Sequence, residues 1–363
     1  MSNYIYSKLS KWYRSPNGFL HFLAYIGYDI IGLPLYWITQ GKEQFQLLPE
    51  LMETMKRQGR KITAFTKLDI LFEFIFHGYL AYEYVAYHFE TKSFKERKVF
   101  YSEMDRWRFT NIVNNRSDIW KLRNKRLAYE IFKDWYKREQ IIVKSMDDLE
   151  TYKQFASKHS KFFAKPYAGG GGLGARWVEV NKYASIDESL ETLLKDGSFV
   201  LEEGVYQCSE MASFNPDSIN TVRIVTIRSN NKVSIWHALI RTGRKGLIVD
   251  NGASGGLFVL VDHKTGKIIS GGANERGDLF LNHPDSNVPF IGFQIPMWKE
   301  LCDMSIEMME AMPSINCIGW DLAVTDKGPV VIEANGQTSL CGPQLTQQIG
   351  LRKDYEEMLM IIK

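Results

Sequence analysis

A short polar segment between two apolar runs near the C-terminus is the feature that most constrains the fold. The runs cover residues 319–325 and 329–336, and the sequence Asp-Lys-Gly fills positions 326–328 between them. Apolar runs of this length joined by a tight polar turn are typical of an antiparallel β-hairpin. Because successive side chains of a strand point to opposite faces, the positions of its polar residues decide which of them can meet.

Three oxygen-bearing side chains lie on this hairpin. Asp321 is on its first strand, and Glu333 and Asn335 are two residues apart on its second strand, so these two share a face. Hard oxygen ligands of this kind suit Mg²⁺, which is usually held by one or two carboxylates together with substrate phosphates. The sequence predicts a metal site made of Asp321, Glu333 and Asn335, for Mg²⁺ or alternatively Mn²⁺. A hairpin with only solvated acids is the other interpretation of this stretch.

The composition is that of a globular protein. The 363 residues suffice for two or three domains, and 45% hydrophobic and 24% charged residues are ordinary proportions. The four cysteines are scattered without a paired spacing, which disfavours a disulfide framework or zinc site and fits a reducing compartment. The first residues show no signal-peptide pattern, and no feature indicates nucleic-acid binding.

The N-terminal part is rich in aromatic residues and in positive charge. Residues 1–160 hold 26 Lys and Arg against 18 Asp and Glu, whereas the remainder holds 19 against 24. Residues 17–40 and 68–89 predict helices with broad apolar faces. We expect a helical subdomain that packs on the core, or an aromatic surface that lies in the interface of an anionic membrane. Asp29 and Pro34 disfavour a membrane-spanning helix.

A glycine-rich loop follows a short strand, residues 162–166, that carries Lys165. The loop contains the consecutive glycines Gly169, Gly170, Gly171 and Gly172. Its backbone N–H groups can close on phosphate oxygens, and Lys165 would add a point charge beside them. It is not a Walker loop, because the Gly-Lys-Ser/Thr end is missing, and residues 176–180 predict a returning strand rather than a Rossmann helix. A glycine hinge without a ligand is the alternative.

Two strand arginines are candidate catalytic residues, together with Lys165 and Asn220. Residues 218–227 predict a strand with Asn220 on one face and Arg223 on the other. An arginine on a central strand is costly unless it is paired, so we expect Arg223 to face the active site and bind a phosphate or carboxylate bidentately. Arg241 on the next strand is a second arginine of this kind, and the sequence supports the same role for it less strongly.

Two polar loops and a histidine complete the candidate features. Residues 250–256 form a small-residue loop that can approach an acceptor or phosphate closely, with a plain turn as the alternative. Residues 337–344 form a polar loop that we expect in the acceptor pocket. His237 is expected to be hydrogen-bonded within its sheet rather than to act as a base. No Ser-His or Cys-His pair is evident, so the substrate itself is the expected nucleophile.

Together these motifs resemble the ATP-grasp superfamily, and most closely the sugar-transfer-associated ATP-grasp family found with bacterial polysaccharide genes. The resemblance runs from about residue 124 to the C-terminus and is carried by Lys165 with its glycine loop, residues 218–223, residues 252–256 and the hairpin. It implies an α/β ATP-grasp fold of α+β subdomains, with the nucleotide between two of them and a helical region before them. The expected divisions are 1–98 (helical, aromatic-rich), 99–200 (lid with glycine loop) and 201–363 (metal site).

The resemblance also implies which residues bind ATP. Backbone groups around Glu203 and Val205 would pair with adenine, and Glu210, seven residues after Glu203, would accept the ribose hydroxyls. Lys125 would reach the phosphates. The full implied set is Lys125, Lys165, Gly169, Gly170, Gly171, Gly172, Glu202, Glu203, Val205 and Glu210.

The resemblance implies an ATP- and Mg²⁺-dependent carboxylate–amine ligase that forms an amide through an acylphosphate. Its substrates would be an amino acid or other carboxylate and a sugar or nucleotide-sugar, in cell-surface polysaccharide synthesis. ATP use places the protein in the cytoplasm, with peripheral contact to the inner face of the cell membrane as an extension. A kinase acting on a sugar hydroxyl and a non-catalytic membrane scaffold are the alternatives.

Overall fold

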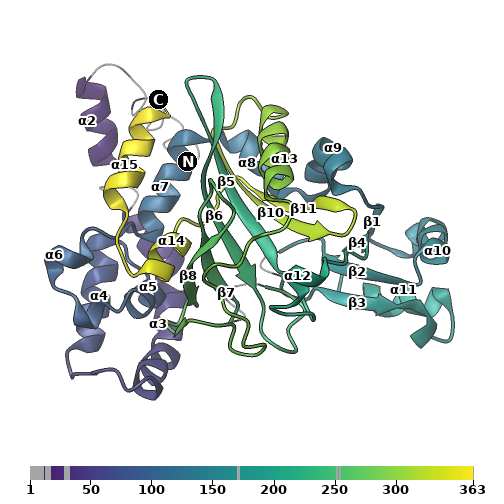
Figure 1. Ribbon diagram of the computed structural model, residues 1–363, viewed down its shortest axis with the longest axis horizontal. Coiled ribbons are helices and arrows are strands. Elements are labelled where there is room, and N and C mark those ends of the chain that lie inside the picture. Colours follow the sequence, from purple (N-terminus) through teal and green to yellow (C-terminus); the bar gives the residue numbers. More distant parts are fainter. Residues whose placement is uncertain are drawn as a thin grey trace.

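The computed structural model describes residues 12, 18–27, 33–169, 172–250, 252 and 255–362. Two antiparallel sheets organise it. The smaller sheet has the strand order β1-β4-β2-β3, and the larger has the order β11-β10-β5-β6-β7-β8-β9. Figure 1 shows the smaller sheet with its helices at one end of the long axis, the larger sheet in the middle and the N-terminal helices at the other end.

The N-terminal region is helical, as predicted. Its elements are α2 (Gly18–Gly27), α3 (Leu33–Arg57), α4 (Thr66–His77), α5 (Ala81–Ala86), the 3₁₀ helix η2 (Phe89–Thr91) and α6 (Phe94–Arg97). Tyr84, Tyr87 and Phe89 are buried here and pack against Leu239 and Phe258 of the larger sheet. The expected packing of this region on the core is therefore confirmed. Among the helices that the structure describes, none is long and apolar enough to cross a membrane.

The smaller subdomain is a four-stranded sheet with two α-helices and two short 3₁₀ helices. Its elements are β1 (Gln140–Val143), η3 (Met146–Asp148), α10 (Leu149–Lys158), β2 (Lys161–Pro166), β3 (Arg176–Glu179), η4 (Val180–Lys182), α11 (Ile186–Leu194) and β4 (Phe199–Glu203). Tyr152, Phe155, Phe162 and Leu190 belong to its separate core. Because β4 pairs with both β1 and β2, the boundary expected between residues 200 and 201 falls inside a strand.

The larger subdomain is built on the seven-stranded sheet. Its strands are β5 (Thr221–Ser229), β6 (Lys232–Thr242), β7 (Leu257–Val261), β8 (Ile268–Ala273), β9 (Leu279–Phe280), β10 (Cys317–Thr325) and β11 (Gly328–Asn335). Its helices are α7 (Glu103–Val113), α8 (Arg116–Arg123), α9 (Lys125–Tyr136), α12 (Ser209–Ala212), α13 (Trp298–Glu310), α14 (Gly342–Gln347) and α15 (Arg352–Ile361). The helices α7 to α9 thus precede the smaller sheet in sequence but pack on the larger one, which the expected division at residue 99 did not anticipate.

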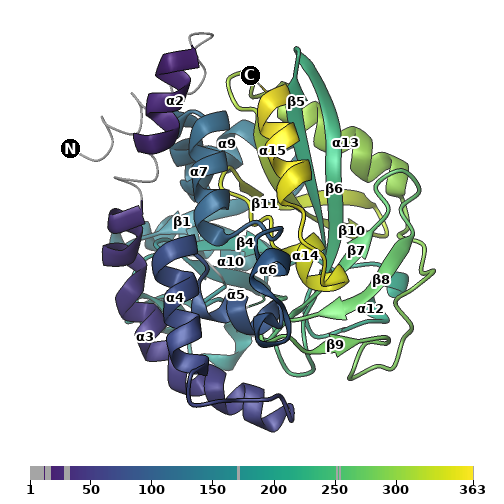
Figure 2. The same cartoon turned by 90° about the vertical axis from the view of Figure 1, so that its left-hand side faces the viewer.

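Helices cover both faces of the larger sheet (Figures 1 and 2). One face packs on α9 and α13 through Phe132, Met304 and Met308. The opposite face packs on α7 and α15 through Phe109 and Tyr355, and α14 covers a neighbouring part of it. The polar end of this second face is left open toward the smaller subdomain, and there the functional side chains gather.

Candidate functional site

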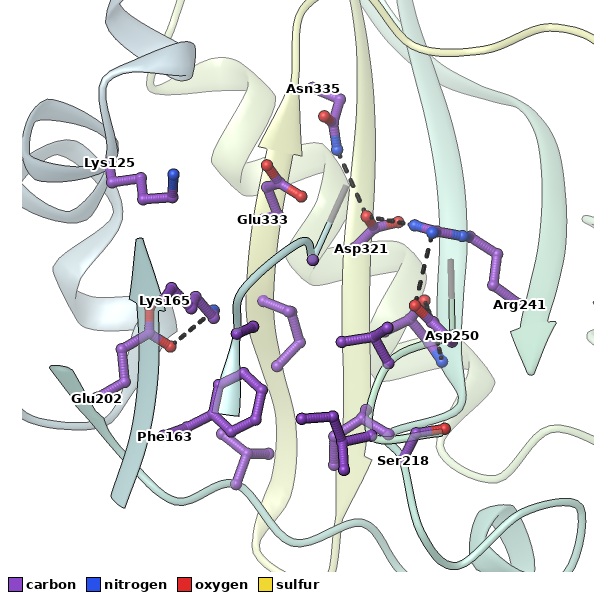
Figure 3. Close-up of a pocket in the computed structure, with 18 of the residues that line it drawn as sticks. Lys125, Phe163, Lys165, Glu202, Ser218, Arg241, Asp250, Asp321, Glu333 and Asn335 are labelled. Atoms are coloured by element: carbon purple, nitrogen blue, oxygen red, sulfur yellow. Dashed lines mark hydrogen bonds and ion pairs between the residues drawn. The ribbon is translucent and has the colours of Figure 1, made fainter. Parts of the chain in front are cut away.

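A cavity of about 1040 Å³ lies between the two sheets. Most of the sequence-predicted site residues line it: Lys125, Lys165, Gly169, Gly172, Glu202, Glu203, Val205, Arg223, Arg241, Asp321, Glu333 and Asn335. Gly170 and Gly171 lie outside the described residues. Figure 3 shows Lys165 on the smaller sheet and the acidic hairpin on the larger sheet facing each other across this space.

The strand register explains why Asp321 is the centre of the site. On β10 it stands opposite Arg223 of β5 on one side and opposite Glu333 of β11 on the other. Nε and Nη2 of Arg223 donate to its two oxygens at 2.5 and 2.8 Å, and Nη1 of Arg241 donates at 2.9 Å. Burial opposes ionisation, but the two arginines outweigh it and lower the pKa of Asp321. Asp321 is therefore a buried carboxylate held by a bidentate fork and a second guanidinium.

Glu333 and Asn335 complete the predicted acidic set. Asn335 lies beside Asp321, with Nδ2 at 3.4 Å from Oδ2. Burial in the cleft and the charge of Asp321 raise the pKa of Glu333. No donor among the described residues holds the Glu333 carboxylate. Glu333 and Asn335 share the cavity face because they are two residues apart on β11, and the pairing shift after Asp321 leaves Ile332 as an extra residue of β11.

These three side chains fit a divalent cation. Two carboxylates and one amide oxygen form a hard donor set, and Glu333 has oxygens that no described donor occupies. The described part of the chain has no group of three or more His, Cys, Asp or Glu side chains arranged to hold a metal ion, and the hairpin set consists of two carboxylates and the Asn335 amide. Mg²⁺ at this position would share its remaining coordination with phosphate oxygens.

Lys165 is held by a buried ionic network that the sequence did not reveal. Its Nζ donates to Oε2 of Glu202 at 2.9 Å, and Arg138 donates to the same oxygen through Nε and Nη2 at 3.0 and 2.8 Å. Gln140 donates to the other oxygen at 3.0 Å. The paired acids at the end of β4 were the available signal, but nothing in the sequence shows that Arg138 reaches them. Glu202 thus positions Lys165 at the cavity wall.

This network makes stability depend on pH. Burial opposes ionisation of Glu202, but Arg138 and Lys165 lower its pKa from 4.5 to about 2. A lowered folded-state pKa contributes stability above pH 4.5, which is lost as the pH falls toward 2. We expect the free energy of unfolding of Glu202→Gln to change less between these pH values than that of the wild type, as measured by urea denaturation. Glu130→Gln, which alters an exposed pair with Arg126, should keep the wild-type slope.

Lys125 contacts the glycine loop. Asn124 caps α9 by accepting hydrogen bonds from the backbone N–H groups of Arg126 and Leu127 at 3.1 and 3.2 Å, which places Lys125 at the first helical position. Its Nζ donates to the carbonyl oxygens of Tyr167 and Gly169 at 3.3 and 3.0 Å. Lys125 therefore ties α9 to the loop that was predicted to bind phosphates.

Gly172 brings the loop against the larger subdomain. It has φ of 71°, and a Cβ added there would lie 2.9 Å from Cγ1 of Val249. Glycine is therefore required both by the backbone conformation and by the close approach to Val249. This contact closes one side of the cavity.

Two predicted residues lie outside the cavity lining. Asn220 is fully buried, and its Nδ2 donates to Oε1 of Gln207 and to the carbonyl oxygens of Met211 and Asn215. Its oxygen accepts the Thr242 hydroxyl. Asn220 thus faces the core side of β5, opposite to Arg223, and its place corrects the catalytic role predicted for it.

Glu210 is exposed on the short helix α12 and accepts a hydrogen bond from the Ser209 hydroxyl at 2.9 Å. The structure does not bring it to the cavity that holds Glu203 and Val205. The ribose-binding role predicted from its spacing is therefore not supported by its position.

His237 also differs from expectation. It is buried, and neither ring nitrogen has a hydrogen-bond partner among the described residues. Burial and the nearby charge of Arg223 lower its pKa to about 3, so it is neutral. The predicted hydrogen bond within the sheet is wrong.

The structure adds two acidic residues to the cavity wall, Asp250 and Glu275. Asp250 accepts hydrogen bonds from the hydroxyl and N–H of Thr221, and its oxygen lies 3.5 Å from Nη2 of Arg241. Burial raises its pKa despite Arg241. The small-residue loop that begins at Asp250 was the signal in the sequence, and no pattern pointed to Glu275. Residues 337–339 of the predicted acceptor loop also line the cavity.

A large cleft between two subdomains that are each built on an antiparallel sheet, with a lysine and a glycine loop facing an acid–acid–amide hairpin, is typical of the ATP-grasp class. Residues 104–358 match the family described as sugar-transfer associated ATP-grasp. This match spans most of the chain, and the protein belongs to that family. No curated protein matches the sequence.

Several solved structures are similar at low identity. The ATP-grasp ligase PsnB with its minimal precursor, Mg and ADP has a TM-score of 0.42 and 13% identity, over 72% of this chain and 68% of that one. D-alanyl-alanine synthetase A of Vibrio cholerae has a TM-score of 0.40 and 12% identity, over 70% and 65% of the two chains. D-alanine–D-alanine ligase of Bacillus anthracis, complexed with ATP, has a TM-score of 0.41 and 12% identity, over 70% of this chain and 67% of that one. The assignment rests on the family match and the site.

Proposed function

We propose that the protein is an ATP- and Mg²⁺-dependent ligase that joins a carboxylate, such as an amino acid, to an amine of a sugar or nucleotide-sugar. The observation that carries this proposal is the cavity in which Lys165 and the glycine loop face Asp321, Glu333 and Asn335. A phosphate-binding wall opposite an acidic hairpin suits phosphoryl transfer, in which positioning and charge neutralisation do most of the work.

The reaction would proceed in two steps. An oxygen of the substrate carboxylate bonds to the γ-phosphorus of ATP while the bond to ADP breaks, which gives an acylphosphate. The amine then attacks the carbonyl carbon, inorganic phosphate leaves with the electron pair of the C–O bond, and one amine proton passes to solvent. The substrate amine is the nucleophile, so no enzyme nucleophile is needed.

The residues of the chain would hold and orient the reactants. Asp321, Glu333 and Asn335 would bind Mg²⁺, which supplies counter-charge to the phosphate oxygens when bound. Lys165, fixed by Glu202, presents its ammonium group to the same space. Because ATP is the energy source, we place the reaction in the cytoplasm.

A sugar kinase is the second candidate. It would use the same phosphate-binding wall, and one observation favours it: the Asp250 carboxylate lies on the cavity wall beside Arg241, where it could accept the proton of an attacking hydroxyl. The two candidates differ in the fate of the phosphoryl group. A ligase releases it as inorganic phosphate, whereas a kinase leaves it on the sugar.

Nucleotide binding is the first expected result. Because a ligand that binds only the folded state stabilises it, millimolar ATP with Mg²⁺ should raise the melting temperature measured by differential scanning fluorimetry. EDTA should reduce the shift. An unchanged melting temperature at millimolar ATP contradicts the proposal.

The reaction itself is tested by screening ADP release against panels of amino acids and nucleotide-sugars. For an active pair, the carboxylate is then labelled with ¹⁸O. A ligase transfers one labelled oxygen into the released phosphate, which mass spectrometry detects, and the sugar gains the acyl group. A phosphorylated sugar without released phosphate identifies the kinase instead.

A further inference from the structure

Helix α4 carries apolar side chains on two opposite faces. Ile70 and Phe74 lie on the buried face and pack in the N-terminal core. The exposed large side chains of this segment are Phe65 (72% exposed), Leu68 (60%), Phe72 (45%), Ile75 (36%) and Phe76 (62%). Their spacing of three or four residues places them on one stripe of the helix. A surface helix ordinarily presents polar residues on its outer face, so this apolar stripe is a candidate surface for binding a partner or a membrane.

The stripe continues onto α6 through ring contacts. The rings of Phe72 and Phe76 are 4.8 Å apart, Phe72 and His77 are 5.5 Å apart, and His77 and Phe94 are 5.1 Å apart. The Lys98 ammonium lies 4.2 Å from the centre of the Phe94 ring. We call the surface formed by Phe65, Leu68, Phe72, Ile75, Phe76 and Phe94 the aromatic face. Figure 2 shows α4 and α6 beside each other on the side of the molecule turned to the viewer.

The acidic residues of these two helices all have hydrogen-bond partners within the protein. Asp69 and Glu73 of α4 both accept hydrogen bonds from Arg97, at 2.8 and 2.9 Å. Glu96 of α6 accepts from the N–H and hydroxyl of Ser93 in a capping box. The negative charges of α4 are therefore drawn away from the aromatic face.

The lysines next to the residues of the aromatic face, in contrast, have no acidic partner among the described residues. Lys67, Lys95 and Lys98 are exposed, and none has an acidic partner among the described residues. Exposed aromatic rings, with a lysine over one of them and two more lysines adjacent in sequence, match a surface with an apolar interior and a layer of phosphate above it. A lipid bilayer with anionic headgroups has this structure, and each lysine near it adds to binding.

We propose that the aromatic face of α4 and α6 docks the protein on an anionic lipid bilayer. This inference does not depend on the reaction that the enzyme catalyses. The face lies at the end of the long axis opposite to α10 and α11 of the smaller subdomain (Figure 1), so docking leaves that subdomain free. It also moves the membrane contact from residues 17–40, one of the two stretches expected from the sequence, to α4 and α6.

The test is co-sedimentation of the full chain with vesicles of phosphatidylcholine alone or with phosphatidylglycerol added. We expect binding to the anionic vesicles only. The double substitution Phe72→Ser/Phe76→Ser should weaken it by roughly 10-fold or more, because the aromatic anchors are lost. The double substitution Lys95→Glu/Lys98→Glu should weaken binding to the anionic vesicles by about the same factor. Raising the salt concentration should also weaken this binding by about that factor. Leu281→Ser, which removes an apolar side chain that is 77% exposed elsewhere, should bind like the wild type.

A second measurement places the face directly at the bilayer. A Phe76→Cys variant in a Cys302→Ser background, labelled with an environment-sensitive fluorophore, should shift to the blue with anionic vesicles, and a Leu281→Cys variant should not. Equal binding of the Phe72→Ser/Phe76→Ser variant and the wild type would overturn the proposal. So would self-association in solution that this variant abolishes, because the face would then bind a second copy of the chain.

Discussion

Glu333→Gln is expected to lower turnover by at least about 10²-fold with saturating substrates. The substitution keeps the size of the side chain but removes one of the two negative charges that the hairpin places in the cavity. Glu333 is also the member of the set whose oxygens no described donor occupies, so its loss removes the most available metal ligand. ADP formation under steady-state conditions measures the effect. The affinity for ATP without metal should change little, because Lys165 and the glycine loop stay in place.

The matched control lies on the same hairpin. Asp326→Asn removes an exposed carboxylate at the β10–β11 turn, away from the cavity, and should keep wild-type turnover. If Glu333→Gln forms ADP at a near-normal rate, the metal site is not at this hairpin, and the roles assigned to Asp321 and Asn335 are wrong as well.

Arg223→Lys is expected to slow turnover by roughly 10- to 100-fold while leaving the affinity for Mg²⁺-nucleotide nearly unchanged. Lysine keeps the positive charge but cannot form the two parallel hydrogen bonds that now hold the Asp321 carboxylate. Asp321 would keep its contact with Arg241 but lose its fixed orientation. Turnover from ADP release and nucleotide affinity from calorimetry separate these two quantities.

Arg228 offers the same substitution on the same strand. Its Nη2 donates to the carbonyl oxygen of Met309 at 2.6 Å, and it does not line the cavity. Arg228→Lys should therefore leave turnover unchanged. A loss of nucleotide affinity in Arg223→Lys equal to its loss of turnover would show that Arg223 binds the ground state and does not position Asp321 for the reaction.

Local patterns predicted most of the elements and the centre of the site. The apolar runs and the Asp-Lys-Gly turn correctly indicated β10 and β11, and the alternation of residues 218–227 correctly placed Arg223 and Asn220 on opposite faces. Sequence alternation is reliable here because burial on a central strand leaves little freedom in register. The same alternation explains why the catalytic role predicted for Asn220 was wrong, since a residue on the strand face opposite to Arg223 must face the core.

Features that depend on long-range contacts could not be predicted. The partner of Glu202 is Arg138, 64 residues earlier, and no local pattern connects the two. Glu210 was assigned by spacing alone, but the chain turns into α12 before it and carries it to the surface. His237 is buried with no hydrogen-bond partner among the described residues, which a strand pattern cannot show. The exposed stripe of α4 likewise could not be told from a buried one by periodicity.

The strand order of the larger sheet has a consequence for folding. β5 lies between β6, which follows it directly, and β10, with which it pairs across 98 residues at Asp321 and Arg223. During synthesis at about 5–20 residues per second, one edge of β5 stays unpaired for on the order of 5–20 s until β10 has been synthesised. An unpaired strand edge is prone to aggregation, and pairing at such separation is slow. The hairpin of β10 and β11 is thus among the last parts of the chain to form, and nucleotide binding would report that folding is complete.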